Sequence, residues 1–286
     1  PDVRAMFEGL RNDDGDQRIV LLKNEDGLFW APAWGFINIP YWNLTEGYQV
    51  NMVEAIEYAI EGTPIPADAD IPLEPGWNLI AYFPTYNLDA SAPDFYVLSP
   101  VIDNVFLAKD VNGLFLSPRF NFSNMRDWTE GQGYQVRITG EEEIVLNYPE
   151  EMEGMAFAQL GTDLGGHWTA PVSTSENMSV LVSSISGVEL AEGDQIAAFN
   201  AAGEVIGAGN IIDGRAGLAV WGDDKTTEIK DGLRVGEGFE LRLWSSKSDI
   251  ESLLSIESGH NGYQPVFEVD GFSALSVRSA AQIPSE

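Results

Sequence analysis

Alternating apolar and polar residues predict short β-strands along much of the chain. In the segment FELRLW, Phe239, Leu241 and Leu243 would share one face of a strand, while Glu240 and Arg242 share the other. Short runs of this kind recur from about residue 154 onward, separated by turn sequences such as NAAGE and DGRAG. Seven or more such strands within residues 151–286 predict an antiparallel β-sandwich.

Two hairpins are predicted in the first half of the chain. VLLKNEDGLFW carries Asp26-Gly27 between two apolar runs, and VFLAKDVNGLFLSP carries Asn112-Gly113 at the same place. Such dipeptides favour tight turns because glycine tolerates positive φ. Each hairpin is therefore expected to begin a small antiparallel sheet.

Apolar residues at helical spacing precede each hairpin. Before the first, Val3, Met6, Phe7 and Leu10 follow the i, i+3, i+4, i+7 pattern, which predicts an amphipathic helix of about three turns. Before the second, the spacing is looser and Pro100 would interrupt or kink the helix. The apolar positions there are Ala92, Phe95, Leu98 and Ile102.

Both hairpins belong to a duplicated segment. Residues 21–50 align with residues 107–136 without a gap, and thirteen of the thirty positions are identical. The identities include Trp42/Trp128 and a shared Gly-Tyr-Gln-Val, which is expected to form a strand after a turn that its glycine permits. A duplication of this length indicates two copies of one module.

The second copy has an opening strand that the first copy lacks. The sequence GWNLIAYF, residues 76–83, has a counterpart that would lie before Pro1. Without such a strand, apolar side chains would stay uncovered, which costs several kcal/mol at roughly 25 cal/mol per Å², and the sheet would keep an unpaired edge. We therefore expect the first module to be completed by a strand from another copy of the chain or from preceding modules of the same polypeptide.

These patterns predict a mainly β protein of three parts. Residues 1–66 form a first α+β module without its opening strand, and residues 67–150 form a complete second module. Residues 151–286 form the β-sandwich and a C-terminal linker.

Composition narrows the functional classes. The chain has 45 acidic and 15 basic residues and a formal net charge of -30, which argues against a nucleic-acid partner and favours high solubility. It has no cysteine, so a disulfide, a Cys-ligated zinc and a thiol nucleophile are all excluded. No run of 18 apolar residues occurs, and membrane insertion is not expected.

Calcium and polysaccharide are the ligands that single residues suggest. Acidic residues crowd two turn-rich stretches, where their oxygens could bind Ca²⁺, although ordinary solvated turns explain them better and neither stretch matches the twelve-residue calcium loop. The two sets are Asp13, Asp14 and Asp16, and Asp223, Asp224, Glu228 and Asp231. Trp30 and Trp34, which the second copy replaces with Leu116 and Phe120, could stack on sugar rings or serve as core or interface residues.

No pattern predicts catalysis. His167 and His260 are the only histidines, and neither lies in a metal-ligand or nucleophile-base pattern. We therefore expect a protein that is not an enzyme.

The segments LEPGWNLIAYFP, LAKDVNGLFLSP and WTEGQGYQVRI resemble modules found near the C-termini of large secreted proteins of Bacteroidota and Rhodothermota. GDQIAAFNAAGEVIGAG and AGLAVWGDD resemble the β-sandwich domain that often follows them, and the final AQIPSE resembles the linker to a type IX secretion sorting domain. The resemblance implies an extracellular or cell-surface location in a bacterium. It leaves two functions open, a structural or adhesive subunit of a surface stalk or filament, or a carbohydrate-binding tail of a larger secreted hydrolase.

Overall fold

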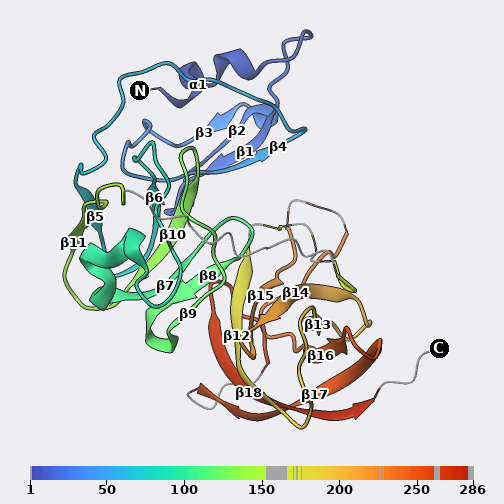
Figure 1. Ribbon diagram of the computed structural model, residues 1–286. Helices are drawn as coiled ribbons and strands as arrows, with labels where there is room; N and C mark the ends of the chain where they lie inside the picture. Colours follow the sequence, from blue (N-terminus) through green and yellow to red (C-terminus); the bar gives the residue numbers. More distant parts are fainter. Residues whose placement is uncertain are drawn as a thin grey trace. The chain divides into compact units, whose positions relative to one another are not determined.

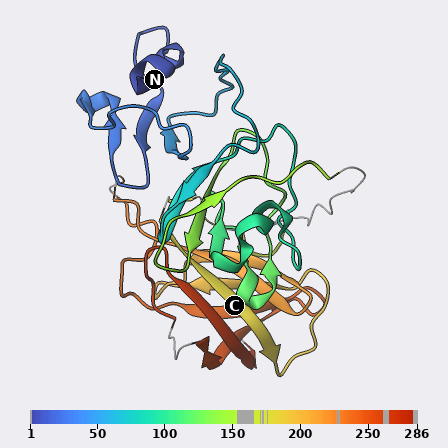
Figure 2. The same ribbon diagram turned by 90° about the vertical axis from the view of Figure 1, so that its left-hand side faces the viewer.

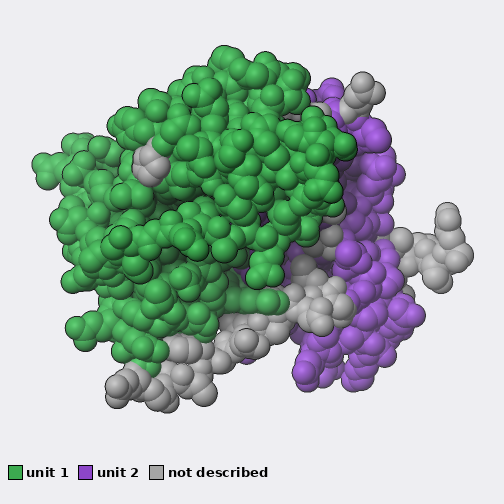
Figure 3. Space-filling view, turned by 90° about the horizontal axis from the view of Figure 1, so that it is seen from above, with its two compact units in different colours: residues 1–110, 116–159 green, residues 111–115, 160–286 purple. Residues whose placement is uncertain are grey.

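The computed structural model describes residues 2–152, 166–169, 171, 173–174, 176–225, 227, 229–260 and 265–282. Two compact units divide the chain, one formed by residues 1–110 and 116–159 and the other by residues 111–115 and 160–286 (Figure 3). Strands dominate both units, which confirms the predicted mainly β fold. Most of both duplicated modules belongs to the first unit, and residues 111–115 of the second hairpin are assigned to the second.

The first module contains a four-stranded antiparallel sheet with the order β3-β2-β1-β4 (Figure 1). Its core is formed where one face of the sheet packs against the N-terminal helical residues. The predicted hairpin joins β1 to β2, and Gly27 in its turn has a φ of +75°. The strands are β1 (Ile19–Lys23), β2 (Phe29–Ala31), β3 (Phe36–Ile37) and β4 (Gln49–Met52).

The N-terminal helix is shorter than the apolar spacing predicts. An α-helix, α1, covers Val3–Met6 and a 3₁₀ helix, η1, covers Glu8–Leu10. Asp2 caps α1, since its carboxylate accepts hydrogen bonds from the backbone N–H groups of Arg4 and Ala5 at 2.9 and 3.1 Å. Gly9, a residue with low helix propensity, lies in η1 just after the α-helix ends.

The second module has the five-stranded order β6-β10-β7-β8-β9 (Figures 1 and 2). Its predicted opening strand is present as β6, which pairs along its whole length with β10. The expected helix is a 3₁₀ helix, η3 (Tyr96–Asn104), with Pro100 inside it. The strands are β6 (Gly76–Ala81), β7 (Val105–Lys109), β8 (Phe115–Ser117), β9 (Phe122–Ser123) and β10 (Gly133–Ile138), and a separate pair is β5 (Ile71–Leu73) with β11 (Ile144–Leu146).

The two module sheets correspond strand by strand. The order β4, β1, β2, β3 in the first repeats β10, β7, β8, β9 in the second. Even the 3₁₀ turns match, because η2 (Pro32–Trp34) and η4 (Pro118–Phe120) are each followed by a residue in the left-handed conformation. Among the described residues, β6 is the strand of the second sheet that has no equivalent in the first.

The second unit holds seven strands in the closed order β12-β15-β14-β13-β16-β17-β18. The predicted sandwich is correct in its strand number and its largely antiparallel pairing, but the strands close into one barrel. Closure follows from β18, which pairs antiparallel with β17 and parallel with β12. The strands are β12 (Asn177–Ser186), β13 (Gln195–Phe199), β14 (Val205–Ile212), β15 (Arg215–Trp221), β16 (Glu240–Ser245), β17 (Ile250–Gly259) and β18 (Phe272–Gln282).

Candidate functional site

A stacked Trp–Tyr pair explains why the chain repeats the segment that ends in Gly-Tyr-Gln-Val. The rings of Trp42 and Tyr48 stack at 3.9 Å, and those of Trp128 and Tyr134 stack at 3.8 Å. In each copy the tyrosine hydroxyl also accepts a hydrogen bond from the backbone N–H that follows the tryptophan, at 2.8 Å in the first and 2.9 Å in the second. The repeated motif therefore builds and closes a turn, and its role is structural.

The glycine of the motif does not serve the turn as predicted, because neither Gly47 nor Gly133 has a positive φ. A Cβ atom at Gly47 would lie 2.9 Å from the carbonyl oxygen of Ile80. The same atom at Gly133 would be 3.6 Å away, which is ordinary contact. Gly47 is thus required by the close approach of the first module to β6.

In the second module the stacked pair lies inside a closed aromatic cluster. Tyr82, which follows β6, meets Trp128 and Tyr134 edge-on at 6.4 and 6.1 Å. Tyr148 meets Trp128 at 6.3 Å and Tyr82 at 5.0 Å. Burial raises the pKa of Tyr134 to about 12, so its phenol stays neutral at any physiological pH.

In the first module, no strand in the described parts of the chain pairs with the outer edge of β4. Val50 and Val136 are the same residue at the same register, since Val50 pairs with Leu22 on β1 and Val136 pairs with Ala108 on β7. Val136 is fully buried, whereas Val50 is 42% exposed. Asn78 of β6 lies beside Val136. Strand β6, which pairs with Val136, therefore has no counterpart beside Val50 within the described residues.

Exposed apolar side chains are concentrated in this module. Ten of the sixteen large hydrophobic residues found exposed in the described parts of the chain lie between residues 20 and 60. This concentration makes the first module the candidate interaction surface, since contiguous exposed apolar area is typical of such surfaces. They are Val20, Trp34, Phe36, Tyr41, Leu44, Val50, Val53, Ile56, Tyr58 and Ile60.

The hairpin tip of the first module touches the outer edge of β6. Glu25 accepts a hydrogen bond from Leu79 N–H, and Gly47 N–H donates to Leu79 O at 2.7 Å. Burial, together with the charges of Glu46 and Asp26, raises the pKa of the Glu25 carboxyl. The second copy has Val111 at the position of Glu25, so this charged contact was not predicted, although the non-conservative difference between copies could have drawn attention to it.

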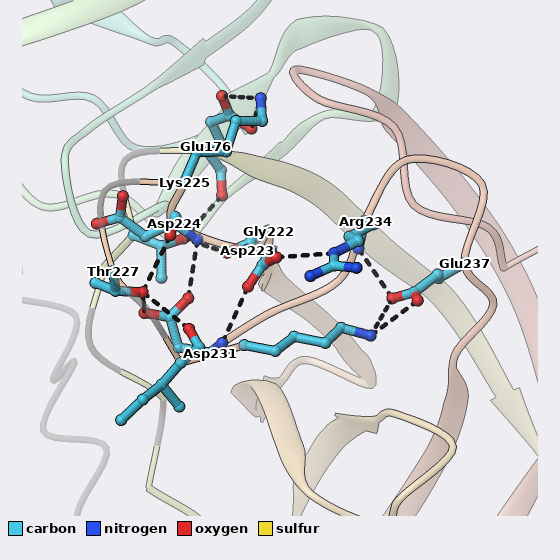
Figure 4. Close-up of polar contacts among 12 residues, drawn as sticks. Glu176, Gly222, Asp223, Asp224, Lys225, Thr227, Asp231, Arg234 and Glu237 are labelled. Carbon is cyan, nitrogen blue, oxygen red and sulfur yellow. Dashed lines mark hydrogen bonds and ion pairs between the residues drawn. The ribbon is translucent and has the colours of Figure 1, made fainter.

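The predicted calcium residues of the C-terminal half lie in a loop that is tied together internally (Figure 4). Asp223 binds Arg234 Nε at 3.0 Å and accepts Asp231 N–H at 3.1 Å, while Asp231 accepts Asp224 N–H at 2.8 Å. The hydrogen bond from Arg234 holds the pKa of Asp223 below its ordinary value. Glu228 lies outside the described residues. Two carboxylates of this set thus already serve as acceptors within the loop.

Further ion pairs extend this loop. Lys230 Nζ lies 2.7 Å from a carboxylate oxygen of Glu237, which also accepts Arg234 N–H at 2.9 Å. These contacts lower the pKa of Glu237, with the Arg234 N–H as the larger cause and Lys230 next. The loop is therefore held by ion pairs of Lys230 and Arg234 with the carboxylates of Glu237 and Asp223.

The N-terminal acidic set occupies an exposed turn after η1. Asn12 closes this turn by accepting Asp16 N–H on its side chain at 2.8 Å, and the remaining candidates, Asp13 and Asp14, are exposed. Within the described residues, no group of three or more His, Asp or Glu side chains is placed to hold a metal ion.

The two candidate sugar-stacking residues have opposite environments. Trp30 is 4% exposed and stacks with Phe7 in the module core, where no ligand reaches it. Trp34 in η2 is 80% exposed. Phe36, close to it in sequence, contacts Phe29 with 4.8 Å between ring centroids. Of the two candidates, Trp34 is therefore the one whose ring a ligand could reach.

His167 stacks on Trp244 at 4.8 Å, and its Nε2 lies 2.8 Å from Glu251. Neighbouring Trp168 is buried against Phe199 on the outside of the barrel. These contacts give His167 a packing role. His260 directly follows β17.

Comparison with known proteins finds no matching protein family, curated protein or solved structure. No helix within the described ranges is both long and apolar enough to cross a membrane.

Proposed function

We propose that the chain is a non-catalytic structural or adhesive protein on the outside of a bacterial cell, where it forms part of a surface stalk or an extracellular filament. The observation that carries this proposal is the exposure of Val50 against the complete burial of Val136 in the other copy. A module with an open sheet edge gains stability by pairing with another strand. Other copies of the chain or preceding modules of the polypeptide would supply it.

Two sequence features support an exported location. The large acidic excess keeps a crowded extracellular protein soluble, and AQIPSE at residues 281–286 resembles a linker to a type IX sorting domain. Residues 283–286 of this linker lie outside the described parts of the chain. Export by that route is part of the proposal.

Electron microscopy of the protein purified from the cells that make it tests the structural role. We expect filaments, or arrays on the cell surface, with a regular repeat. Preparations that contain only dispersed particles would rule out the filament.

A carbohydrate-binding tail of a larger hydrolase is the second candidate, favoured by the exposed indole of Trp34. Titration with soluble polysaccharides, followed by tryptophan fluorescence and by retardation in affinity gels, tests it. Binding that Trp34→Ala abolishes would support this function. Tyr41→Ala, which removes another exposed aromatic ring of the same module, is the matched control.

A further inference from the structure

We propose that the outer edge of β4 binds one extended strand, antiparallel to β4, whose inward side chains repeat the chemistry of Asn78, Ile80 and Tyr82. This inference rests on the proposed assembly function and names the partner of its open edge. The second module supplies the template, because its sheet is the same sheet with that strand in place.

The register of the bound strand follows from the second module. Asn78 lies opposite Val136, and Ile80 lies opposite Tyr134. Since Val136 and Tyr134 correspond to Val50 and Tyr48, the incoming strand places its polar amide beside Val50 and its aliphatic residue beside Tyr48. An error of one residue would turn every side chain to the wrong face.

The backbone groups that would form the new ladder can also be identified. On β6, Leu79 N–H and C=O and Ala81 N–H already bond outward, to Glu25, Gly47 and Thr45. Because bonding direction alternates along a strand, the N–H groups of residues 78 and 80 face β10. The corresponding groups of an incoming strand would face β4.

Val50 presents the matching groups on β4. Val53 N–H bonds to Arg18 O on the β1 side, so Gln49 and Asn51 also face β1 and Val50 faces outward. No strand in the described parts of the chain pairs with this edge.

The side chains of the bound strand that point toward the module core follow from the residues that they would cover. Ile80 is buried in the second module, and Tyr82 lies against both rings of the Trp–Tyr stack. In the first module the Trp42–Tyr48 stack contacts Phe7, whose ring centroid lies 5.6 Å from that of Trp42. Within the described residues, no tyrosine takes the place that Tyr82 has in the second module. An aromatic residue at the third inward position would close the cluster.

Within the described residues, the chain does not cover this edge with a strand of its own. Tyr58, which follows β4, packs on Phe7 and donates its hydroxyl proton to Met6 O at 2.7 Å, so the segment after β4 covers the helix. Strand β6 of the same chain is already paired with β10 on one edge and bonded to Thr45 and Gly47 on the other.

Charge restricts the partner further. Glu46 lies within 3.4 Å of the Tyr48 hydroxyl, and Glu54 follows β4. With a formal net charge of -30, the chain repels an acidic strand. The partner is therefore a neutral or basic segment, as residues 76–83 are themselves uncharged.

A synthetic peptide with the sequence of residues 76–83, flanked by lysines and labelled with a fluorophore, provides the test. We expect saturable one-to-one binding to the full chain in fluorescence anisotropy. N-methylation at the residue corresponding to Ile80 should weaken binding by about tenfold or more, since it removes an N–H group that would face β4 and blocks the ladder. N-methylation at the residue corresponding to Leu79, whose N–H group would point away from β4, should change binding little.

Two protein variants localise the binding. Val50→Pro removes the outward N–H of an edge strand, a position that tolerates proline, and should abolish binding while circular dichroism stays unchanged. Val53→Ser, which removes an exposed apolar side chain next to β4, is the control and should bind the peptide as the original chain does. Absence of peptide binding, or equal binding of the two N-methylated peptides, would overturn the proposal, and the peptide pair decides even if Val50→Pro fails to fold.

The two proposals fail separately. Filaments in micrographs without peptide binding would remove this strand assignment and leave the structural role intact. Peptide binding by a protein that stays dispersed in micrographs would support the strand assignment and count against the filament.

Discussion

At the scale of one residue, Val50 and Val136 can be compared to measure how much a neighbouring strand stabilises the module. Both valines occupy the same position in the repeated module, and β6 pairs with the strand of Val136 only. The comparison therefore keeps residue type and position in the module constant, while the strand beside each valine differs.

Truncating these valines should have unequal effects on stability. Val136→Ala is expected to lower the free energy of unfolding by about 2 kcal/mol, because a fully buried side chain loses its contacts. Val50→Ala should cost less than about 1 kcal/mol, since much of the side chain is already in water. Denaturant unfolding followed by tryptophan fluorescence measures both. Equal losses would mean that β4 is already covered in solution.

Glu25 is a second residue whose effect follows from its surroundings. Its pKa is raised mainly by burial, then by Glu46 and Asp26, so the ionised carboxylate is disfavoured in the folded state. A raised folded pKa gives stability below the ordinary carboxyl pKa, and this stability is lost as pH rises through the folded pKa.

Glu25→Gln should therefore raise the melting temperature at pH 7, because the amide keeps an acceptor for Leu79 N–H without the buried charge. The difference from the original chain should vanish as the pH falls below the ordinary carboxyl pKa, where Glu25 is protonated in both the folded and the unfolded state. Thermal melts at pH values on both sides of that pKa measure this. Glu57→Gln, an exposed change in the same module, serves as control, and a destabilised Glu25→Gln at pH 7 would show that the charged hydrogen bond outweighs desolvation.

At the scale of elements, local patterns predicted the strands and hairpins well. Asp-Gly and Asn-Gly dipeptides mark both hairpin turns, and strict alternation in β10 matches the burial of Tyr134, Val136 and Ile138. These features depend on a few consecutive residues, so the sequence contains all the information that determines them.

Features that depend on distant residues were not predictable in this way. A sandwich and a barrel have the same alternation within each strand, and the parallel pairing of β12 with β18 joins residues about ninety positions apart. Close contact between β14 and β15 also depends on glycine, since a Cβ at Gly207 would lie 2.1 Å from Ala219 O. The contact of Glu25 with Leu79 likewise arises only when the two modules meet.

The loop containing Asp223 gives a prediction at the scale of an element. Its basic residues Lys230 and Arg234 are trypsin sites that ion pairs hold in place. Asp223→Asn removes the charged partner of Arg234 and should speed tryptic cleavage within the loop at pH 8. Glu257→Gln removes a comparable exposed pair with Arg278 between two barrel strands and should leave the cleavage rate unchanged. Equal rates for Asp223→Asn and the original chain would mean that the ion pair does not order the loop.

At the scale of the whole molecule, the main electrostatic feature is the formal net charge of -30. Surplus carboxylates repel one another in the folded state and resist the approach of further copies. Salt shortens the range of this repulsion, from about 30 Å at 0.01 M to about 3 Å at 1 M. Folding and assembly should both be favoured by salt.

The melting temperature should therefore rise steadily between about 0.01 and 1 M NaCl, because added salt screens the repulsion between carboxylates. Scanning calorimetry measures it, and a fall would mean that attractive pairs such as Arg278–Glu257 outweigh the repulsion. Comparing CaCl₂ with MgCl₂ at equal ionic strength separates screening from specific binding. Equal shifts are expected from screening alone, whereas a larger shift with calcium, removed by Asp14→Asn, would place a Ca²⁺ site at the turn after η1.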